Sequence, residues 1–171
     1  MNTPLYLSIA VPVYNEEDSV RLLYEKIRIV CQSIKKPYEI IFVDDGSSDR
    51  TPKILQEIQD ADPHFRRVQF RKNYGQTAAM AAGFDAARGE RVVSMDGDLQ
   101  NDPSDIPMLL NKMEEGYDVV CGWRKNRQDK FWSRRFPSII KPMQFGVFLL
   151  MNLHHNKNSC AYTGAPVSCG C

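Results

Sequence analysis

Three apolar runs in the first 100 residues each end in a turn that carries acidic or amide side chains. The runs cover residues 5–13, 38–43 and 91–95, and the turns are Asn15-Glu16-Glu17, Asp44-Asp45 and Asp96-Gly97-Asp98. Apolar residues at helical spacing follow the first two runs, for example at residues 20–34. Strands that alternate with helices in this way predict βαβ units, and therefore an α/β fold with a mostly parallel sheet flanked by helices.

The order of these segments predicts where a ligand binds. In a parallel sheet, ligands bind outside the carboxyl ends of the strands, and all three acidic turns are expected there. Hard divalent cations take oxygen ligands and are often completed by substrate phosphates. An acidic site repels a diphosphate unless a cation lies between them, so the turns predict binding of a nucleotide diphosphate through a metal.

Other nucleotide sites are disfavoured by the same turns. The first strand ends in Tyr14-Asn15-Glu16-Glu17, without the glycine fingerprint of a dinucleotide site, and the chain has no P-loop motif. An aspartyl phosphatase would carry paired aspartates after the first strand, where this chain has two glutamates.

Composition fits one globular domain. The 171 residues are 43% hydrophobic and 25% charged, and the net charge of +1 gives no field that would attract nucleic acid. The amino terminus lacks the basic region of a signal peptide, and an odd cysteine count with Cys31 and Cys121 in expected core elements indicates reduced thiols in a cytoplasmic protein.

The final third of the chain differs from the rest. Six basic residues crowd into residues 124–135, which is typical of a solvated face or an anion site. Residues 145–151 are too few for a membrane span and predict a packed or interfacial helix. Three cysteines and two histidines in residues 154–171 match no standard zinc spacing. We expect residues 141–171 to form a tail that is partly irregular.

Five ordered segments make the chain recognisable: residues 11–17 (Val-Pro-Val-Tyr-Asn-Glu-Glu), 43–49 (Val-Asp-Asp-Gly-Ser-Ser-Asp), 73–76 (Asn-Tyr-Gly-Gln), 96–103 (Asp-Gly-Asp-Leu-Gln-Asn-Asp-Pro) and 122–129 (Gly-Trp-Arg-Lys-Asn-Arg-Gln-Asp). Over about residues 5–140 the chain resembles inverting family-2 glycosyltransferases, of the dolichol-phosphate mannose synthase and bacterial polyprenyl-phosphate glycosyltransferase type. The resemblance implies a GT-A (Rossmann-like nucleotide-diphospho-sugar transferase) domain at residues 1–140, followed by the tail.

The resemblance also implies roles for individual residues. Asp96, Asp98 and Gln100 would hold Mg²⁺ or Mn²⁺, with Asp96 also near the ribose. The residues that would line the base and ribose pocket are Pro12, Tyr14, Glu16 and Asp44. Simpler interpretations remain open: Tyr14 as a core aromatic, Asp45 and Asp49 as turn or cap residues, and Asn73 with Gly75 as a turn. The donor would be a UDP- or GDP-linked sugar.

The implied acceptor is a polyprenyl (dolichyl or undecaprenyl) phosphate. A monophosphate is largely dianionic at neutral pH, so its oxygen is already a nucleophile, and the protein must mainly supply positive charge. Arg127, Arg134 and Arg135 are the implied acceptor contacts and, with Asp98, the catalytic residues. Arginine suits phosphate because its guanidinium group binds two oxygens at once.

The match to the family pattern ends before the acceptor-side Asp-x-Gly element, which residues after Arg135 lack. The chain therefore resembles a carboxy-terminally truncated member. An inactive nucleotide-binding module, or a partner of a full-length subunit, is the alternative to a membrane-associated enzyme. A homo-oligomer and contact with a membrane surface are further expectations.

Overall fold

The computed structural model describes residues 4–99, 101–122, 148–152 and 160–163. Its elements are β1 (Leu7–Val13), α1 (Val20–Ile34), β2 (Tyr38–Asp44), α2 (Thr51–Ala61), β3 (Phe65–Gln69), α3 (Gln76–Ala86), β4 (Arg91–Ser94), the 3-10 helix η1 (Pro103–Asp105), α4 (Ile106–Glu114), β5 (Val119–Gly122), β6 (Phe148–Asn152) and β7 (Cys160–Thr163). The alternation of strand and helix predicted for the first 100 residues is confirmed.

All the strands join one sheet in the order β3-β2-β1-β4-β6-β5-β7. β1 pairs in parallel with β2 and β4, and β2 pairs in parallel with β3. The chain therefore builds outward from β1 in one direction with β2 and β3, and returns to its other side with β4. This reversal between β1 and β4 is a topological switch point, where ligands bind in open α/β sheets.

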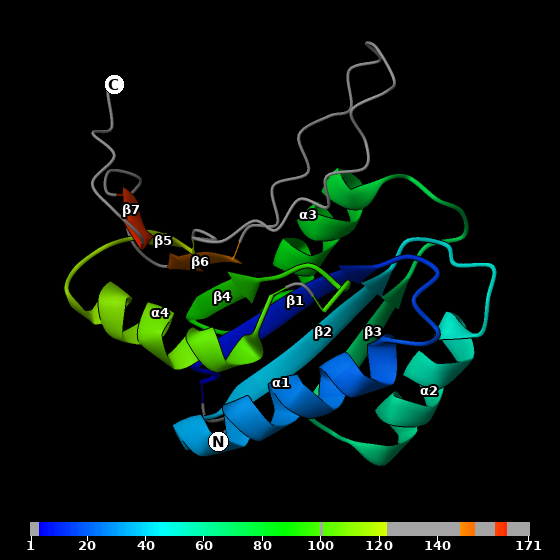
Figure 1. Cartoon of the computed structure of the whole chain (residues 1–171), viewed down its shortest axis with the longest axis horizontal. Coiled ribbons are helices and arrows are strands. Elements are labelled where there is room, and N and C mark those ends of the chain that lie inside the picture. The colour runs from blue at the N-terminus through cyan, green and yellow to red at the C-terminus, as the bar shows by residue number, and fades with distance from the viewer. Residues whose placement is uncertain (1–3, 100, 123–147, 153–159, 164–171) are drawn as a thin grey trace, which may run out of the picture.

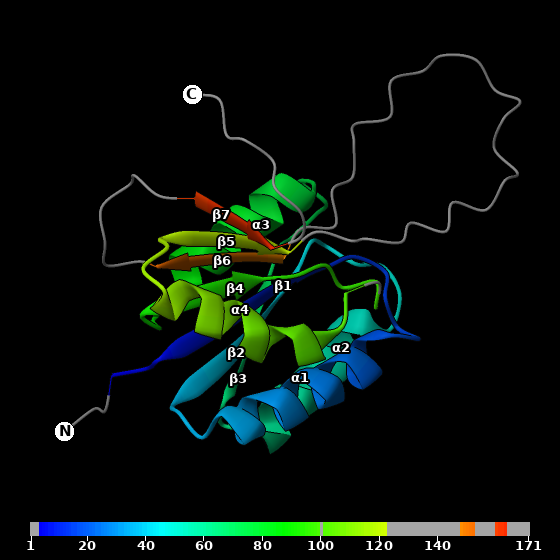
Figure 2. The same ribbon diagram turned by 60° about the vertical axis from the view of Figure 1, so that its left-hand side comes forward.

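Helices cover both faces of the sheet, as the sequence predicted. Figures 1 and 2 show α1, α2 and α4 over one face and α3 over the other. Every residue of β1 and β2 is buried, which explains why these strands are continuous apolar runs rather than alternating ones. The main core lies under α1, α2 and α4, whereas a smaller cluster around Ile41, Val43 and Ala79 packs under α3.

The sheet continues into the tail of the chain that was expected to be partly irregular. β6 lies between β4 and β5 and pairs antiparallel with both, and β7 pairs in parallel with β5. The helix expected at residues 145–151 is wrong for residues 148–151, which belong to β6. A short apolar run fits a buried strand as well as a helix, so its periodicity could not decide between them.

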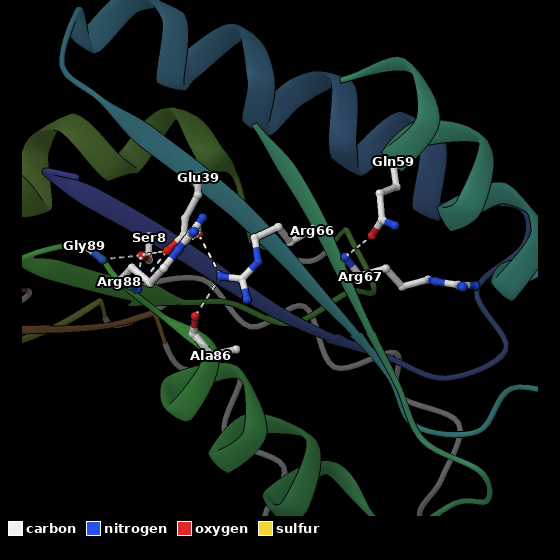
Figure 3. Close-up of polar contacts among 8 residues, drawn as sticks. All are labelled: Ser8, Glu39, Gln59, Arg66, Arg67, Ala86, Arg88 and Gly89. Atoms are coloured by element: carbon white, nitrogen blue, oxygen red, sulfur yellow. Dashed lines mark hydrogen bonds and ion pairs between the residues drawn. The ribbon is translucent and has the colours of Figure 1, made fainter. Parts of the chain in front are cut away.

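A buried carboxylate ties together the amino-terminal edge of the sheet (Figure 3). Glu39 on β2 accepts hydrogen bonds from Ser8 Oγ at 2.7 Å, Arg66 Nη1 at 3.0 Å and Arg88 Nη2 at 2.7 Å. Its side chain is only 2% exposed. Burial raises the pKa of the Glu39 carboxyl, but the hydrogen bonds from Arg88, Ser8 and Arg66 outweigh burial and leave that pKa lower than usual. The cluster joins β1, β2, β3 and the α3–β4 loop.

No helix within the described ranges is long and apolar enough to cross a membrane.

Candidate active site

The loops after β1 and β2 lie side by side at the carboxyl edge of the sheet, joined by hydrogen bonds. Asn15, in a left-handed conformation (φ 53°), donates its backbone N–H to Ser47 Oγ at 2.9 Å. Its side-chain Oδ1 accepts the backbone N–H of Ser48, also at 2.9 Å. An asparagine tolerates this conformation better than most residues. Asn15 thus fixes the geometry with which the chain leaves β1.

Two further bonds strengthen this junction. The backbone N–H of Glu16 donates to Thr51 Oγ1 at 2.9 Å, and that of Glu17 donates to Asp49 Oδ2 at 3.2 Å. Asp49 also contacts the start of α2, where its Oδ1 accepts the N–H of Thr51 at 2.9 Å, although the N-cap residue of the helix is Arg50. The side chains of Ser47 and Asp49 therefore hold the loop after β1 against the loop after β2.

The nucleotide residues implied by the sequence lie at this junction, in different settings. Pro12 is buried within β1, and Tyr14 directly after the strand is 47% exposed, so it is not a core aromatic. The carboxylate of Glu16 accepts a hydrogen bond from the hydroxyl of Ser19, at the start of α1. Only Tyr14 of these three presents a large exposed surface to a ligand.

Asp44 is the last residue of β2 and is fully buried. Its Oδ1 accepts the backbone N–H of Ser47 at 2.9 Å, whereas its buried Oδ2 has no hydrogen-bond partner among the described residues. An unsatisfied buried acceptor is costly, so it is a marker for a missing donor such as a ligand N–H.

Asp45 has a different role from its neighbour. Its carboxylate oxygens accept the backbone N–H groups of Tyr74 at 2.7 Å and Gly75 at 2.9 Å, directly before α3. Asp45 is thus a buried residue that fixes the β3–α3 loop, consistent with the simpler interpretation of it as a turn residue. The same bonds hold the turn expected at residues 73–75.

The third acidic turn begins directly after β4, across the switch point from Asn15. Asp96 Oδ1 accepts a hydrogen bond of 2.7 Å from Gln76 Nε2, and Asp98 is exposed. Gly97 between them is buried against β1: a Cβ atom there would lie 2.8 Å from Val13 Cγ1 and 2.9 Å from the carbonyl oxygen of Pro12. Only glycine allows the turn to approach the end of β1 so closely.

These residues fit a divalent cation. Within the described residues no three or more His, Cys, Asp or Glu side chains cluster as a complete metal cage. Mg²⁺ is usually bound by one or two carboxylates, with substrate phosphates and waters as the other ligands, and two carboxylates is the number that Asp96 and Asp98 offer. Gln100 lies outside the described residues, as do Arg127, Arg134 and Arg135.

Sequence reasoning missed two features of this edge. The first is the set of bonds between residues 15–17 and 47–51, and the second is the contact between Gln76 and Asp96. The signal for the second was present, since Gln76 closes one of the five recognisable segments, but its partner 20 residues away could not be read from the chain.

Comparisons with known proteins agree with this geometry. Undecaprenyl-phosphate 4-deoxy-4-formamido-L-arabinose transferase from Pectobacterium carotovorum subsp. carotovorum (strain PC1) is 45% identical over 138 residues, which are 80% of this chain and 42% of that protein. The protein of the same name from Pseudomonas syringae pv. syringae (strain B728a) is 46% identical over 134 residues, 78% of this chain and 40% of the relative. The chain thus spans less than half the length of these relatives.

Solved structures share the fold. Residues 1–349 of S. aureus TarS superpose with a TM-score of 0.58 at 18% identity, covering 86% of this chain and 47% of that one. The UDP complex of glucosyl-3-phosphoglycerate synthase from Mycobacterium tuberculosis gives a TM-score of 0.56 at 25% identity and covers 72% of this chain and 46% of the other. The same synthase has also been solved with Mn²⁺, UDP and phosphoglyceric acid.

The α/β fold with a mostly parallel sheet flanked by helices is therefore confirmed as the GT-A type. The model of the family described as "Glycosyl transferase family 2" matches residues 8–171, which extends past the limit of residue 140 that the sequence suggested. This chain belongs to glycosyl transferase family 2.

Proposed function

We propose that this chain transfers a sugar from a nucleotide-diphosphate sugar to a polyprenyl phosphate, with inversion at the anomeric carbon. The observation that carries the proposal is the meeting of three polar turns, after β1, β2 and β4, at the switch point of a family-2 fold. The relatives named undecaprenyl-phosphate transferases support a polyprenyl phosphate as the acceptor.

Binding of the nucleoside is assigned to the residues after β1 and β2. Exposed Tyr14 offers a ring face to the base, and the buried Asp44 Oδ2 offers an acceptor to a base N–H. Uracil and guanine both carry such an N–H, so a UDP-linked or a GDP-linked sugar satisfies this acceptor. The backbone of Pro12 and of Glu16, on either side of Tyr14, completes the proposed pocket.

The diphosphate is assigned to the turn after β4. Asp96 and Asp98, with Gln100, would hold Mg²⁺ or Mn²⁺, and the complex of Mycobacterium tuberculosis glucosyl-3-phosphoglycerate synthase with Mn²⁺ and UDP supports this choice of ion. Such an ion supplies positive charge that neutralises the departing diphosphate. The protein's own contribution is to place two carboxylates beside the end of β1, where Gly97 allows the turn to pack.

In the proposed reaction, a phosphate oxygen of the acceptor attacks the anomeric carbon as the bond from that carbon to the diphosphate breaks. The acceptor oxygen needs no general base, because the monophosphate is largely dianionic at neutral pH. Arg127, Arg134 and Arg135 are proposed to hold this phosphate. Since the lipid stays in a bilayer, we place the reaction at the cytoplasmic face of a membrane.

Product formation tests the proposal. The full chain is incubated with undecaprenyl phosphate and radiolabelled UDP-glucose, UDP-N-acetylglucosamine or GDP-mannose, with Mg²⁺, Mn²⁺ or EDTA. We expect a labelled lipid with one donor, formed only with metal and lost in Asp98→Ala. If the chain binds UDP or GDP only with metal and forms no product from any donor, the result would instead favour a nucleotide-binding module that acts with another subunit.

A further inference from the structure

Gln76 is the first residue of α3, and its side chain reaches from the opposite face of the sheet to the acidic turn after β4. The amide Nε2 donates a hydrogen bond of 2.7 Å to Asp96 Oδ1. We infer that Gln76 is a positioning residue for the metal site: it holds the Asp96 carboxylate in the orientation that binds the cation of the nucleotide diphosphate. This inference rests on the proposed function.

The position of Gln76 is itself fixed from β2. Asp45 binds the backbone N–H groups of Tyr74 and Gly75, so the residue directly before Gln76 cannot shift without breaking a bond to a buried carboxylate. Gly46 packs beneath the same loop: a Cβ atom there would lie 2.4 Å from the carbonyl carbon of Lys72. These contacts hold the loop before α3 in the position from which the amide of Gln76 reaches Asp96.

The chemistry of the contact suits a metal ligand. A carboxylate that binds a cation is usually held by a hydrogen bond from a second residue, and loss of such a partner typically weakens metal binding 10- to 100-fold. A glutamine donates this bond without adding charge. An arginine or lysine in its place would neutralise the carboxylate and compete with the cation.

A substitution of Gln76 can separate this role from a structural one. Gln76→Met keeps the length of the side chain and removes the donor, and Gln76→Asn keeps the amide but shortens its reach. The matched control is Gln56→Met on α2, because Gln56 Nε2 also donates a 2.7 Å hydrogen bond to an aspartate, Asp60. Mn²⁺ binding by the full chain with saturating UDP, and separately GDP, is measured by the loss of the free-ion electron paramagnetic resonance signal, and metal-free nucleotide binding by calorimetry.

We expect both Gln76 variants to raise the dissociation constant of Mn²⁺ about tenfold. Metal-free nucleotide binding and the unfolding temperature should stay at the wild-type values, and Gln56→Met should change neither ion nor nucleotide binding. Equal Mn²⁺ affinity in Gln76→Met and wild type would overturn the inference. A loss of metal-free nucleotide binding as large as the loss of Mn²⁺ binding would overturn it as well.

The result for the wild-type chain distinguishes failure of the proposed sugar transfer from failure of the inference about Gln76. If wild type binds Mn²⁺ with nucleotide but forms no glycolipid, the proposed transfer fails and the role of Gln76 can still stand. If wild type shows no Mn²⁺-dependent binding of either nucleotide, the metal site and the inference fail together.

Discussion

The hydroxyl of Thr51 accepts the backbone N–H of Glu16 at 2.9 Å, across 35 residues of sequence. Thr51 is fully buried and begins α2, whereas Glu16 belongs to the loop that leaves β1. The bond therefore links the start of α2 to the loop that leaves β1. It is part of the junction that carries Tyr14 and Asp44.

Replacement of Thr51 by valine keeps the side-chain shape and leaves the N–H of Glu16 without its acceptor. We expect Thr51→Val to lower the free energy of unfolding by about 1–2 kcal/mol. Thr77→Val, at an exposed position of α3, should change it by less than about 0.5 kcal/mol. Urea unfolding followed by circular dichroism measures both, and equal midpoints for the two variants would contradict this role.

Asp44→Asn should weaken binding of the nucleoside part of the donor. The buried Oδ2 is an acceptor without a partner among the described residues, and an amide supplies only one oxygen where the carboxylate supplies two. Because Oδ1 already binds the N–H of Ser47, we expect at least about a tenfold loss of UMP or GMP affinity, the equivalent of one hydrogen bond of about 1.4 kcal/mol.

Calorimetry without metal measures the affinity for UMP or GMP separately from the proposed metal site at Asp96 and Asp98. Asp60→Asn, on the exposed side of α2, serves as the control and should bind as wild type does. A variant at Asp44 with unchanged nucleotide affinity would show that Oδ2 does not face the base.

Glu39→Gln should destabilise the amino-terminal edge of the sheet. The substitution removes charge-assisted bonds to Arg66 and Arg88. The side chains of these arginines are 38% and 60% exposed, so water can hydrate them once the carboxylate of Glu39 is gone. We therefore expect a loss of about 2 kcal/mol rather than the larger cost of stranding buried charges. Glu57→Gln, which breaks an exposed pair with Arg21, should cost less than about 1 kcal/mol.

The effect of Glu39 should depend on pH in a defined direction. The pKa of Glu39 is lower in the folded chain than its ordinary value of 4.5, so the ionised group stabilises the fold above that pH. This contribution is lost as the pH falls through the lowered pKa. The difference in unfolding free energy between wild type and Glu39→Gln should thus be constant near neutrality and shrink in acid. A difference that grows in acid would refute the assignment.

Cys31 should resist alkylation while the protein is folded. Burial, with a smaller effect from the charge of Asp62, raises the pKa of its thiol to about 12, so almost none is thiolate at pH 8. Treatment with iodoacetamide followed by peptide mass spectrometry should leave Cys31 unmodified in buffer and modify it fully in urea. Rapid modification of Cys31 in buffer would show that α1 opens far more readily than its packing implies.

The sequence predicted β1, α1, β2 and β4 because each of these elements has a strong apolar pattern. It misjudged β6, whose Phe-Leu-Leu-Met run fits a helix as well as a strand until the partners β4 and β5 are known. Glu39 was also hidden, since it lies in an apolar strand and its arginine partners come 27 and 49 residues later.

At the site, the sequence identified which residue types gather at the carboxyl edge but not what each one contacts. Asp44 and Asp45 are adjacent and chemically identical, yet one keeps a buried oxygen without a hydrogen-bond partner among the described residues and the other fixes the loop before α3. That difference depends on the direction in which two successive side chains leave the end of β2. It is a property of the folded backbone, so composition and spacing could not reveal it.

The place of β6 in the sheet has a consequence for synthesis of the chain on the ribosome. β4, which leads directly into the Asp96 turn, has one edge against β1 and the other against a strand that is made more than 50 residues later. Until residues 148–152 leave the ribosome, that second edge lacks its partner and can attract other strands. The half of the sheet that leads to Asp96 and Asp98 is thus the last to be completed, and the half that carries Tyr14 and Asp44 is the first.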